Sequence, residues 1–334
     1  MRTWNGSCGK QSSAYSSYLL YLPGSRDFEA DFPKLVFNVM PSVIAPTGHR
    51  SRAQFQEALK KYYSAHHDLD PSVSQFVQTR SKFIRDAGIP DDEVARLEIM
   101  LPFAAIVNTV PSMFWLICFI LPKPDLVARL RPEVENLIKR DGNEVTINTG
   151  AVEEQCPLLM SCYRETLRVT NHQVSTRTVL EDTVISDGNG NSYLLKKDVV
   201  VQMSIGTSHA IEEYWGPDVS DFNPDRFLQF SNRKTGDSSG PGSPKAIRAA
   251  FQPFGGGHHL CPGRNFAFAE MIALITTILL GYEMDPLDGD WVLPDTATWS
   301  LVDAITKPVA TSKGIKLHLY RREGWEHVTW KYEV

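Results

Sequence analysis

A glycine-rich loop near the end of the chain holds the residue best suited to chemistry. The loop reads Phe-Gly-Gly-Gly-His-His-Leu-Cys-Pro-Gly over residues 254–263, and an apolar segment beginning at Arg264 follows it directly. Backbone N–H groups converge at the start of a helix and stabilise a thiolate there. Glycines let the backbone approach a flat macrocycle and donate hydrogen bonds to a sulfur ligand. Cys261 is therefore a candidate ligand of haem iron.

Other interpretations of this loop must be weighed. Cys261 could be a buried structural cysteine beside a glycine turn, which is the usual role of a free cysteine. His258, His259 and Cys261 could bind zinc, but structural zinc takes four ligands from paired clusters, and the sequence has no Cys-x-x-Cys or His-x-x-x-His partner for them. A phosphate-binding loop needs Gly-Lys-Ser or Gly-Lys-Thr, which is missing here.

The loop resembles the haem-binding signature of the cytochrome P-450 haem-thiolate enzymes. The matching residues are Phe254, Gly255, Gly257, His259, Cys261 and Gly263. The resemblance implies a haem b cofactor whose iron takes the Cys261 thiolate as its axial ligand. In the family, the residue two before the cysteine is a His or Arg that reaches a haem propionate, so His259 is expected to bind the cofactor.

Two charged motifs come before the loop. Glu165-Thr-Leu-Arg168 places a carboxylate and a guanidinium on one helix face, and Arg226 lies in Phe-Asn-Pro-Asp-Arg-Phe. The family resemblance implies that these three residues form a cluster that stabilises the core beside the haem, with a surface ion pair as the alternative. Arg177 stands where the family often has an arginine paired with a propionate, and a solvated arginine at a strand edge is an equal alternative.

The segment Ala-Ile-Val-Asn-Thr-Val-Pro at residues 105–111 resembles the oxygen-binding kink of the family's long helix. Pro111 removes a backbone hydrogen bond and opens the helix, and the Thr109 hydroxyl is expected to pass a proton to dioxygen. The family's usual acid is replaced by Asn108, whose amide cannot relay a proton by ionising, so protons would pass through Thr109 and ordered water. The Asn-Thr-x-Pro variant is similar to sterol hydroxylases and prostacyclin-synthase-like isomerases. Mutual hydrogen bonding inside a core helix is the alternative.

The composition fits a large protein core and excludes several classes of protein. The chain has 334 residues, of which 42% are hydrophobic, enough to bury a sizeable core. A net charge of -5 without an extended basic run argues against nucleic acid as a partner. Five cysteines without close pairing indicate a reducing compartment. The first residues contain no apolar stretch of a signal peptide or anchor.

Hydrophobic periodicity predicts a mainly α protein with a minor β-sheet region. The family resemblance implies that this is the cytochrome P-450 fold lacking its N-terminal part. Residues 1–30 are expected to be irregular, and residues 31–334 to form a partial cytochrome P-450 catalytic domain. Helices are expected at residues 51–67, 71–87, 90–121, 124–140, 153–169 and 264–280. Strands are expected at residues 178–185, 193–203 and 315–320, with a surface loop at 233–244.

The resemblance implies a monooxygenase that hydroxylates or oxidises a bulky lipophilic substrate, such as a sterol, terpenoid or other secondary metabolite. It also implies dioxygen as co-substrate, an NADPH-dependent flavoprotein reductase as electron donor, and the cytosolic face of the endoplasmic reticulum membrane as location. With no anchor in the chain, the cytosol is the alternative location. Two other functions stay open: a haem-thiolate isomerase or dehydratase, and a truncated remnant that does not retain haem.

Overall fold

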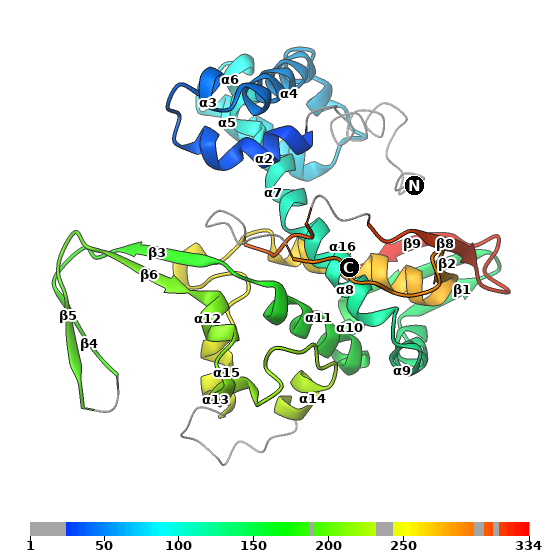
Figure 1. Ribbon diagram of the computed structural model, residues 1–334. Coiled ribbons are helices and arrows are strands. Elements are labelled where there is room, and N and C mark those ends of the chain that lie inside the picture. Colours follow the sequence, from blue (N-terminus) through cyan, green and yellow to red (C-terminus); the bar gives the residue numbers. More distant parts are fainter. Residues whose placement is uncertain (1–24, 188–189, 232–242, 297–303, 310–313, 334) are drawn as a thin grey trace. The chain divides into compact units, whose positions relative to one another are not determined.

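The computed structural model describes residues 25–187, 190–231, 243–296, 304–309 and 314–333 (Figure 1). The chain divides into two compact units, one ending at Val107 and one beginning at Asn108. Each unit buries a hydrophobic core of its own. The candidate haem ligand and both arginine motifs lie in the second unit.

The first unit consists of helices packed around one long helix. Its elements are α2 (Ser25–Val36), α3 (Pro41–Ile44), α4 (Pro46–Ser64), the short 3₁₀ helix η1 (His67–Leu69), α5 (Gln75–Asp86), α6 (Asp91–Glu98) and α7 (Met100–Val107). Helices α2 and α6 both pack against α4. Helices α4 and α5 lie where the amphipathic patterns at 51–67 and 71–87 predict them.

The end of the expected irregular segment is helical instead. Residues 25–30 form the first half of α2 because Phe28, Phe32 and Leu35 recur at helical spacing and pack into the same core as Phe55 of α4. Polar residues between these side chains hide the pattern in the sequence. Residues 1–24 of the expected irregular segment lie outside the described residues.

The core of the second unit lies between four helices. Helices α8 (Thr109–Ile120) and α9 (Pro124–Glu135) each contact both α11 (Pro157–Thr170) and α16 (Arg264–Gly281). Leu116, Leu159 and Ile275 are completely buried between them. The remaining helices are η2 (Thr149–Ala151), α10 (Val152–Gln155), α12 (Ile205–His209), α13 (Glu212–Trp215), α14 (Arg226–Ser231), α15 (Pro244–Ala250) and η3 (Gly257–His259).

Small sheets border these helices. The strands are β1 (Ile138–Asp141), β2 (Glu144–Asn148), β3 (Val174–Thr178), β4 (Thr183–Ser186), β5 (Ser192–Leu195), β6 (Val200–Ser204), β7 (Tyr282–Pro286), β8 (Leu317–Arg321) and β9 (Thr329–Glu333). Strand β2 pairs with β1 antiparallel and with β9 parallel, whereas β3–β6, β4–β5 and β7–β8 are antiparallel pairs. In Figure 1 the β4–β5 hairpin continues the β3–β6 pair as one extended arm.

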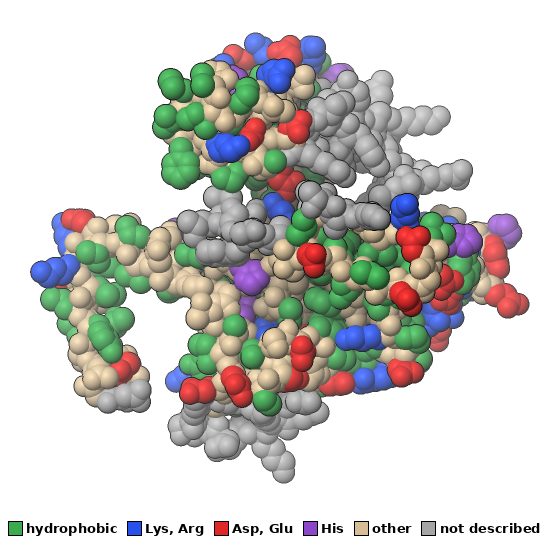
Figure 2. Space-filling model, viewed as in Figure 1, with side chains coloured by type: hydrophobic (Ala, Val, Ile, Leu, Met, Phe, Trp, Pro, Cys, Tyr) green, Lys and Arg blue, Asp and Glu red, His purple; other side chains and the backbone are tan. Residues whose placement is uncertain are grey.

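The arm has many exposed apolar side chains, which Figure 2 shows in green along its length. Leu180 is 82% exposed, and Val184 and Leu194 are 66% and 54% exposed. The sequence predicts the arm as two longer strands at 178–185 and 193–203. The first range covers the end of β3 and most of β4, and the second covers most of β5 and of β6. The strands are shorter than expected because the residues between Thr178 and Thr183 belong to neither β3 nor β4.

Other expected boundaries also differ, for identifiable backbone reasons. The helix expected at 124–140 ends at Glu135, because residues from Ile138 onward pair with β2 around the turn at Gly142. The helix expected at 153–169 breaks at Cys156, just before Pro157. Part of the loop expected at 233–244 lies outside the described residues.

The long helix expected at 90–121 forms three shorter ones, α6, α7 and α8. Pro102 and Pro111 have no N–H to donate to the carbonyls of Glu98 and Val107, four residues earlier, and the helix is interrupted close to both positions. In contrast, the helix expected at 264–280 and the strand expected at 315–320 correspond to α16 and β8.

Two described stretches are long and apolar enough to cross a membrane, judged by length and composition alone. They are Asp91–Ile120 and Arg264–Gly281, and 33% and 56% of their most apolar windows are buried in the protein. The core helix of a soluble protein passes the same test, and α16 contributes Met271, Ile272 and Ile275 to the core of the second unit. These stretches therefore do not establish a membrane span.

Replacing Leu279 by alanine should destabilise the second unit strongly. Leu279 is 1% exposed and lies in the main core, so Leu279→Ala should lower the free energy of unfolding by about 2–5 kcal/mol. Leu274 on the same helix is 36% exposed, and Leu274→Ala should cost about 1 kcal/mol or less. Chemical denaturation followed by tryptophan fluorescence measures both. Equal losses would contradict the position of this core.

Candidate functional site

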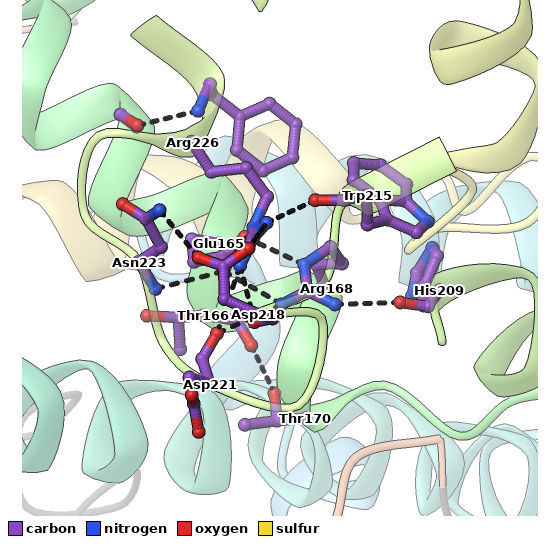
Figure 3. Close-up of polar contacts among 12 residues, drawn as sticks. Glu165, Thr166, Arg168, Thr170, His209, Trp215, Asp218, Asp221, Asn223 and Arg226 are labelled. Atoms are coloured by element: carbon purple, nitrogen blue, oxygen red, sulfur yellow. Dashed lines mark hydrogen bonds and ion pairs between the residues drawn. The ribbon is translucent and has the colours of Figure 1, made fainter. Parts of the chain in front are cut away.

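A buried carboxylate holds two arginines in the centre of the second unit (Figure 3). Glu165 accepts hydrogen bonds from Nε and Nη2 of Arg168, both at 2.8 Å, and from Nε of Arg226 at 2.8 Å. The three side chains are at most 2% exposed. The backbone N–H of Asn223 donates a further bond to Glu165 Oε1 at 3.1 Å. The structure therefore brings together the three charged residues that the sequence singles out.

The two guanidiniums also bind backbone carbonyls from other elements. Arg226 donates to the carbonyls of Trp215, Asp218 and Asp221 and forms an ion pair with the Asp218 carboxylate at 2.8 Å. Burial acts to lower the pKa of Arg226, but its hydrogen bonds to Asp218 and Glu165 outweigh this effect and hold the pKa above its ordinary value. The guanidinium thus stays charged and connects α11 to the loop before α14.

The cysteine loop lies between α15 and α16 and folds back on itself. The N–H of Cys261 donates to the carbonyl of Phe254 at 3.0 Å, and Arg264 Nη1 donates to the carbonyl of Cys261 at 3.0 Å. Gly255 and Gly257 have φ values of +73° and +62°, a conformation that L side chains rarely adopt. These turns place Cys261 two residues before Gly263, the N-cap of α16.

The side chains around Cys261 differ in their environment. The thiol is half-buried, whereas Cys118, Cys156 and Cys162 are buried. Burial raises the pKa of both Cys118 and Cys156 to about 12, so these thiols stay protonated at neutral pH. Among the described cysteines, Cys261 is therefore the accessible one.

Three side chains outside the loop bind its backbone. Asn171 Nδ2 donates to the carbonyl of Pro253 at 2.8 Å, and Arg177 Nη2 donates to the carbonyl of Gly256 at 3.2 Å. His209 Nε2 accepts a hydrogen bond from the N–H of Gln252 at 3.2 Å. The structure thus places Arg177 on the cysteine loop. The sequence analysis missed Asn171 and His209, because neither forms a spacing pattern with a residue of known chemistry.

The His209 ring is buried in an aromatic environment beside a cation. It is 2% exposed and lies against Trp215 and Phe251, with ring centroids at 6.1 and 5.5 Å. Burial, followed by the charge of Arg168, lowers the pKa of His209 from 6.5 to about 4. The ring is therefore neutral at pH 7. Its Nδ1 carries the proton and has no hydrogen-bond partner in the described part of the chain, at a cost of about 1–3 kcal/mol.

Asn108 lies at the break between α7 and α8. Its carbonyl accepts hydrogen bonds from the N–H of Ser112 at 3.1 Å and from the Ser112 hydroxyl at 2.8 Å. Thr109 begins α8 and is half-buried, and Pro111 is buried in its first turn. The helix is thus interrupted at the position that the sequence predicts, and α8 packs against α16, which follows the cysteine loop.

The other predicted cofactor-binding residues have distinct surroundings. Phe254 is half-buried and packs against the main core, while His258 and His259 are exposed in η3. Gly263 is the N-cap of α16, with an ordinary φ of -83°, and a Cβ added there would lie 3.9 Å from the Cys261 sulfur. A side chain at position 263 would therefore meet the sulfur at an ordinary van der Waals distance.

The donor set suits a single thiolate ligand better than a protein-only metal cage. No group of three or more His, Cys, Asp or Glu side chains that could hold a metal ion exists among the residues whose positions are described. The alternative zinc site at His258, His259 and Cys261 is thus not assembled. An accessible thiol at a helix start, in a loop with glycine turns and an arginine beside it, fits the axial ligand of a haem.

Comparisons with known proteins agree with this fold. A family model described as Cytochrome P-450 matches residues 17–310. A cytochrome P-450 monooxygenase of Gibberella zeae is 37% identical over 309 residues, which are 91% of this chain and 58% of that protein. The cytochrome P-450 monooxygenase nodJ of Hypoxylon pulicicidum is 29% identical, over 92% of this chain and 59% of its own length.

More distant similarities extend to a human enzyme and to a solved structure. The human 7-alpha-hydroxycholest-4-en-3-one 12-alpha-hydroxylase is 26% identical, over 82% of this chain and 55% of its own length. A crystal structure of a cytochrome P-450 has a TM-score of 0.59 and 19% identity, covering 83% of this chain and 58% of that chain. The chain spans 55–59% of the length of these curated relatives.

The fold and the family model together define a mainly helical protein of the haem-thiolate class. The chain belongs to the cytochrome P-450 family. Members of that family are oxidoreductases that bind haem through a cysteine thiolate to iron.

Neutralising Glu165 should destabilise the protein far more than neutralising a surface carboxylate. Glu165→Gln leaves the buried Arg168 guanidinium without its counter-charge and Arg226 with the partly exposed Asp218 alone, so the free energy of unfolding should fall by about 3–5 kcal/mol. Glu153 forms an exposed pair with Arg164 at 3.3 Å, and Glu153→Gln should change it by about 0–1 kcal/mol. Urea denaturation measures both values, and similar losses would contradict a structural role for the buried cluster.

Proposed function

We propose that this chain forms the haem-binding part of a cytochrome P-450 monooxygenase, with Cys261 as the axial ligand of haem b iron. The observation that carries this proposal is the half-buried Cys261 thiol at the start of α16, in a loop whose backbone is held by the rest of the second unit. When bound there, thiolate-ligated haem supplies the activation of dioxygen.

Several residues would hold and orient the cofactor. Arg177 binds the loop backbone and His259 lies in the loop itself, and each would donate to a haem propionate. Gly255 and Gly257 keep the loop backbone free of side chains where the macrocycle would approach. Phe254, the first residue of the signature, packs against the main core and so anchors this end of the loop. Glu165, Arg168 and Arg226 would stabilise the core beside the haem without touching substrate.

Thr109 and Asn108 would serve oxygen chemistry at the helix break. The Thr109 hydroxyl can donate a hydrogen bond to dioxygen and pass on a proton, because a hydroxyl is both donor and acceptor. Asn108 cannot ionise, so its amide would orient Thr109 or a water molecule rather than supply the proton. The carbonyl of Asn108 is already bound by Ser112, which stabilises the break.

The substrate we propose is a bulky lipophilic molecule, such as a sterol, a terpenoid or another secondary metabolite. A sterol is supported by the human relative, whose name states 12-alpha-hydroxylation of 7-alpha-hydroxycholest-4-en-3-one. Electrons would come from an NADPH-dependent flavoprotein reductase. The proposed location is the cytosolic face of the endoplasmic reticulum membrane. Nucleic acid does not enter this proposal, since the chain carries a net charge of -5.

Two alternative functions make different demands on the same residues. A haem-thiolate isomerase or dehydratase would need Cys261 but neither reductase nor dioxygen, and the replacement of the usual acid by Asn108 favours it. A non-catalytic remnant would take up no haem. Retention of a threonine at position 109 favours oxygen activation.

Replacing Cys261 should abolish thiolate ligation while leaving the fold intact. Because Cys261 is half-buried in a loop rather than in the core, Cys261→Ala should leave the fold intact. Without the thiolate, the reduced, carbon monoxide-bound, haem-supplied protein should lose its red-shifted band. Cys156 is buried at the junction of α10 and α11, and Cys156→Ala should keep the band.

The measurement is a carbon monoxide difference spectrum after haem addition, with circular dichroism to check folding. A band that survives in Cys261→Ala would contradict the assigned ligand. No haem uptake by the wild-type chain would contradict both enzymatic functions.

Replacing Thr109 by valine should uncouple electron supply from product formation. Valine has the shape of threonine but no hydroxyl, so NADPH oxidation should continue while product formation falls roughly 100-fold and hydrogen peroxide accumulates. Thr109→Ser keeps the hydroxyl and should retain most of the product. The assay supplies reductase, NADPH and a sterol panel to haem-loaded protein. Turnover that is unchanged when the reductase is omitted would instead support the isomerase.

A further inference from the structure

Three successive residues at the start of the cysteine loop each use one backbone group for a specific hydrogen bond. The N–H of Gln252 donates to His209, the carbonyl of Pro253 accepts from Asn171, and the carbonyl of Phe254 accepts from the N–H of Cys261. The first two bonds attach the loop to other elements, and the third attaches Cys261 to the loop. The position of the thiol therefore depends on residues far from it in sequence.

Asn171 is placed by the helix that carries the buried charge cluster. It is the C-cap of α11, and its N–H donates to the carbonyl of Leu167 at 3.2 Å. The whole residue is 1% exposed. Its Oδ1 accepts from the N–H of Gln173 at 3.0 Å while Nδ2 donates to Pro253 at 2.8 Å. Both polar atoms of the side-chain amide are thus hydrogen-bonded, and Nδ2 attaches the loop to the end of α11.

His209 connects the same helix to the loop by a second route. Its carbonyl accepts from Nη1 of Arg168 at 2.7 Å, and its Nε2 accepts from Gln252 at 3.2 Å. The ring packs against both Trp215 and Phe251, so its orientation is restricted. Only a neutral imidazole can accept this bond, and burial keeps the ring neutral at pH 7 by lowering its pKa to about 4.

We propose that His209 and Asn171 are positioning residues for Cys261: together they transfer the fixed geometry of the buried charge cluster to the loop that presents the thiol. This inference rests on the proposed role of Cys261 as the haem ligand. Neither residue touches the thiol. Each acts through the backbone of residues 252–254, and the carbonyl of Phe254 in that segment accepts the hydrogen bond from the Cys261 N–H.

Isosteric variants separate the hydrogen bonds from packing. His209→Phe keeps an aromatic ring against Trp215 and Phe251 but removes the acceptor. His209→Gln removes the ring but restores an acceptor at the same distance from the backbone. Asn171→Asp keeps the shape and Oδ1 but replaces the donor to Pro253 by a second acceptor. Matched controls are His318→Phe on exposed β8 and Asn136→Asp at the exposed C-cap of α9.

The test measures the accessibility of Cys261 in the full haem-free chain. Iodoacetamide alkylation is followed at the Cys261 peptide by mass spectrometry, with the buried Cys118, Cys156 and Cys162 as internal references, and hydrogen exchange is followed at the Cys261 amide. Losing one loop hydrogen bond in His209→Phe or Asn171→Asp should raise both Cys261 rates by about 3- to 10-fold. The reference cysteines and both control variants should keep wild-type rates, and His209→Gln should lie closer to wild type than His209→Phe.

A second readout uses haem-supplied protein. The fraction of haem that shows the thiolate band with carbon monoxide should fall in His209→Phe and Asn171→Asp, and recover in His209→Gln. Unchanged Cys261 rates in both variants, or equal increases at the buried cysteines, would overturn the proposal because the two residues would then be merely structural. Alkylation and exchange need no haem, so they decide this inference even if the wild-type chain takes up none and the proposed function fails.

Discussion

The buried Glu165 carboxylate is the interaction on which the second unit depends. Two guanidiniums meet it at 2.8 Å in a place with almost no access to water. Charges in such a place are tolerated only when each is paired and fully hydrogen-bonded, so the geometry permits little variation. Because Arg168 and Arg226 also bind carbonyls of His209, Trp215 and nearby residues, one charge cluster connects several segments of the second unit.

The cysteine loop illustrates how a rigid site is built from a segment that cannot bury much apolar surface. Its glycines leave few side chains to pack, so its shape is determined by backbone hydrogen bonds to Asn171, Arg177 and His209. These partners come from the end of α11, from β3 and from the end of α12. The loop is thus attached to elements that the charge cluster already holds, while the Cys261 thiol itself stays accessible.

The sequence predicted the parts of this protein that are governed by local chemistry. The apolar run after Cys261 predicts α16, and the Glu-x-x-Arg spacing places both residues on one face of α11. Pro111 indicated the opening of the long helix, whereas the break near Pro102 was not predicted. One boundary failed at β1, whose residues were expected to continue the helix but pair with the neighbouring strand β2 across the tight turn at Gly142. Asn171 and His209 gave no signal, since a polar residue at a helix end is common.

By itself, the sequence determined the residue types that can do chemistry here: a cysteine among glycines, a threonine at a helix break, and a carboxylate with two arginines in a fixed order. These features follow from covalent structure and local backbone preferences. Only the tertiary structure decided that Arg226 reaches Glu165 across 61 positions, and that the loop of Cys261 is held from α11 and α12. The contacts to the loop depend on backbone groups that every residue has, and therefore leave no pattern in the sequence.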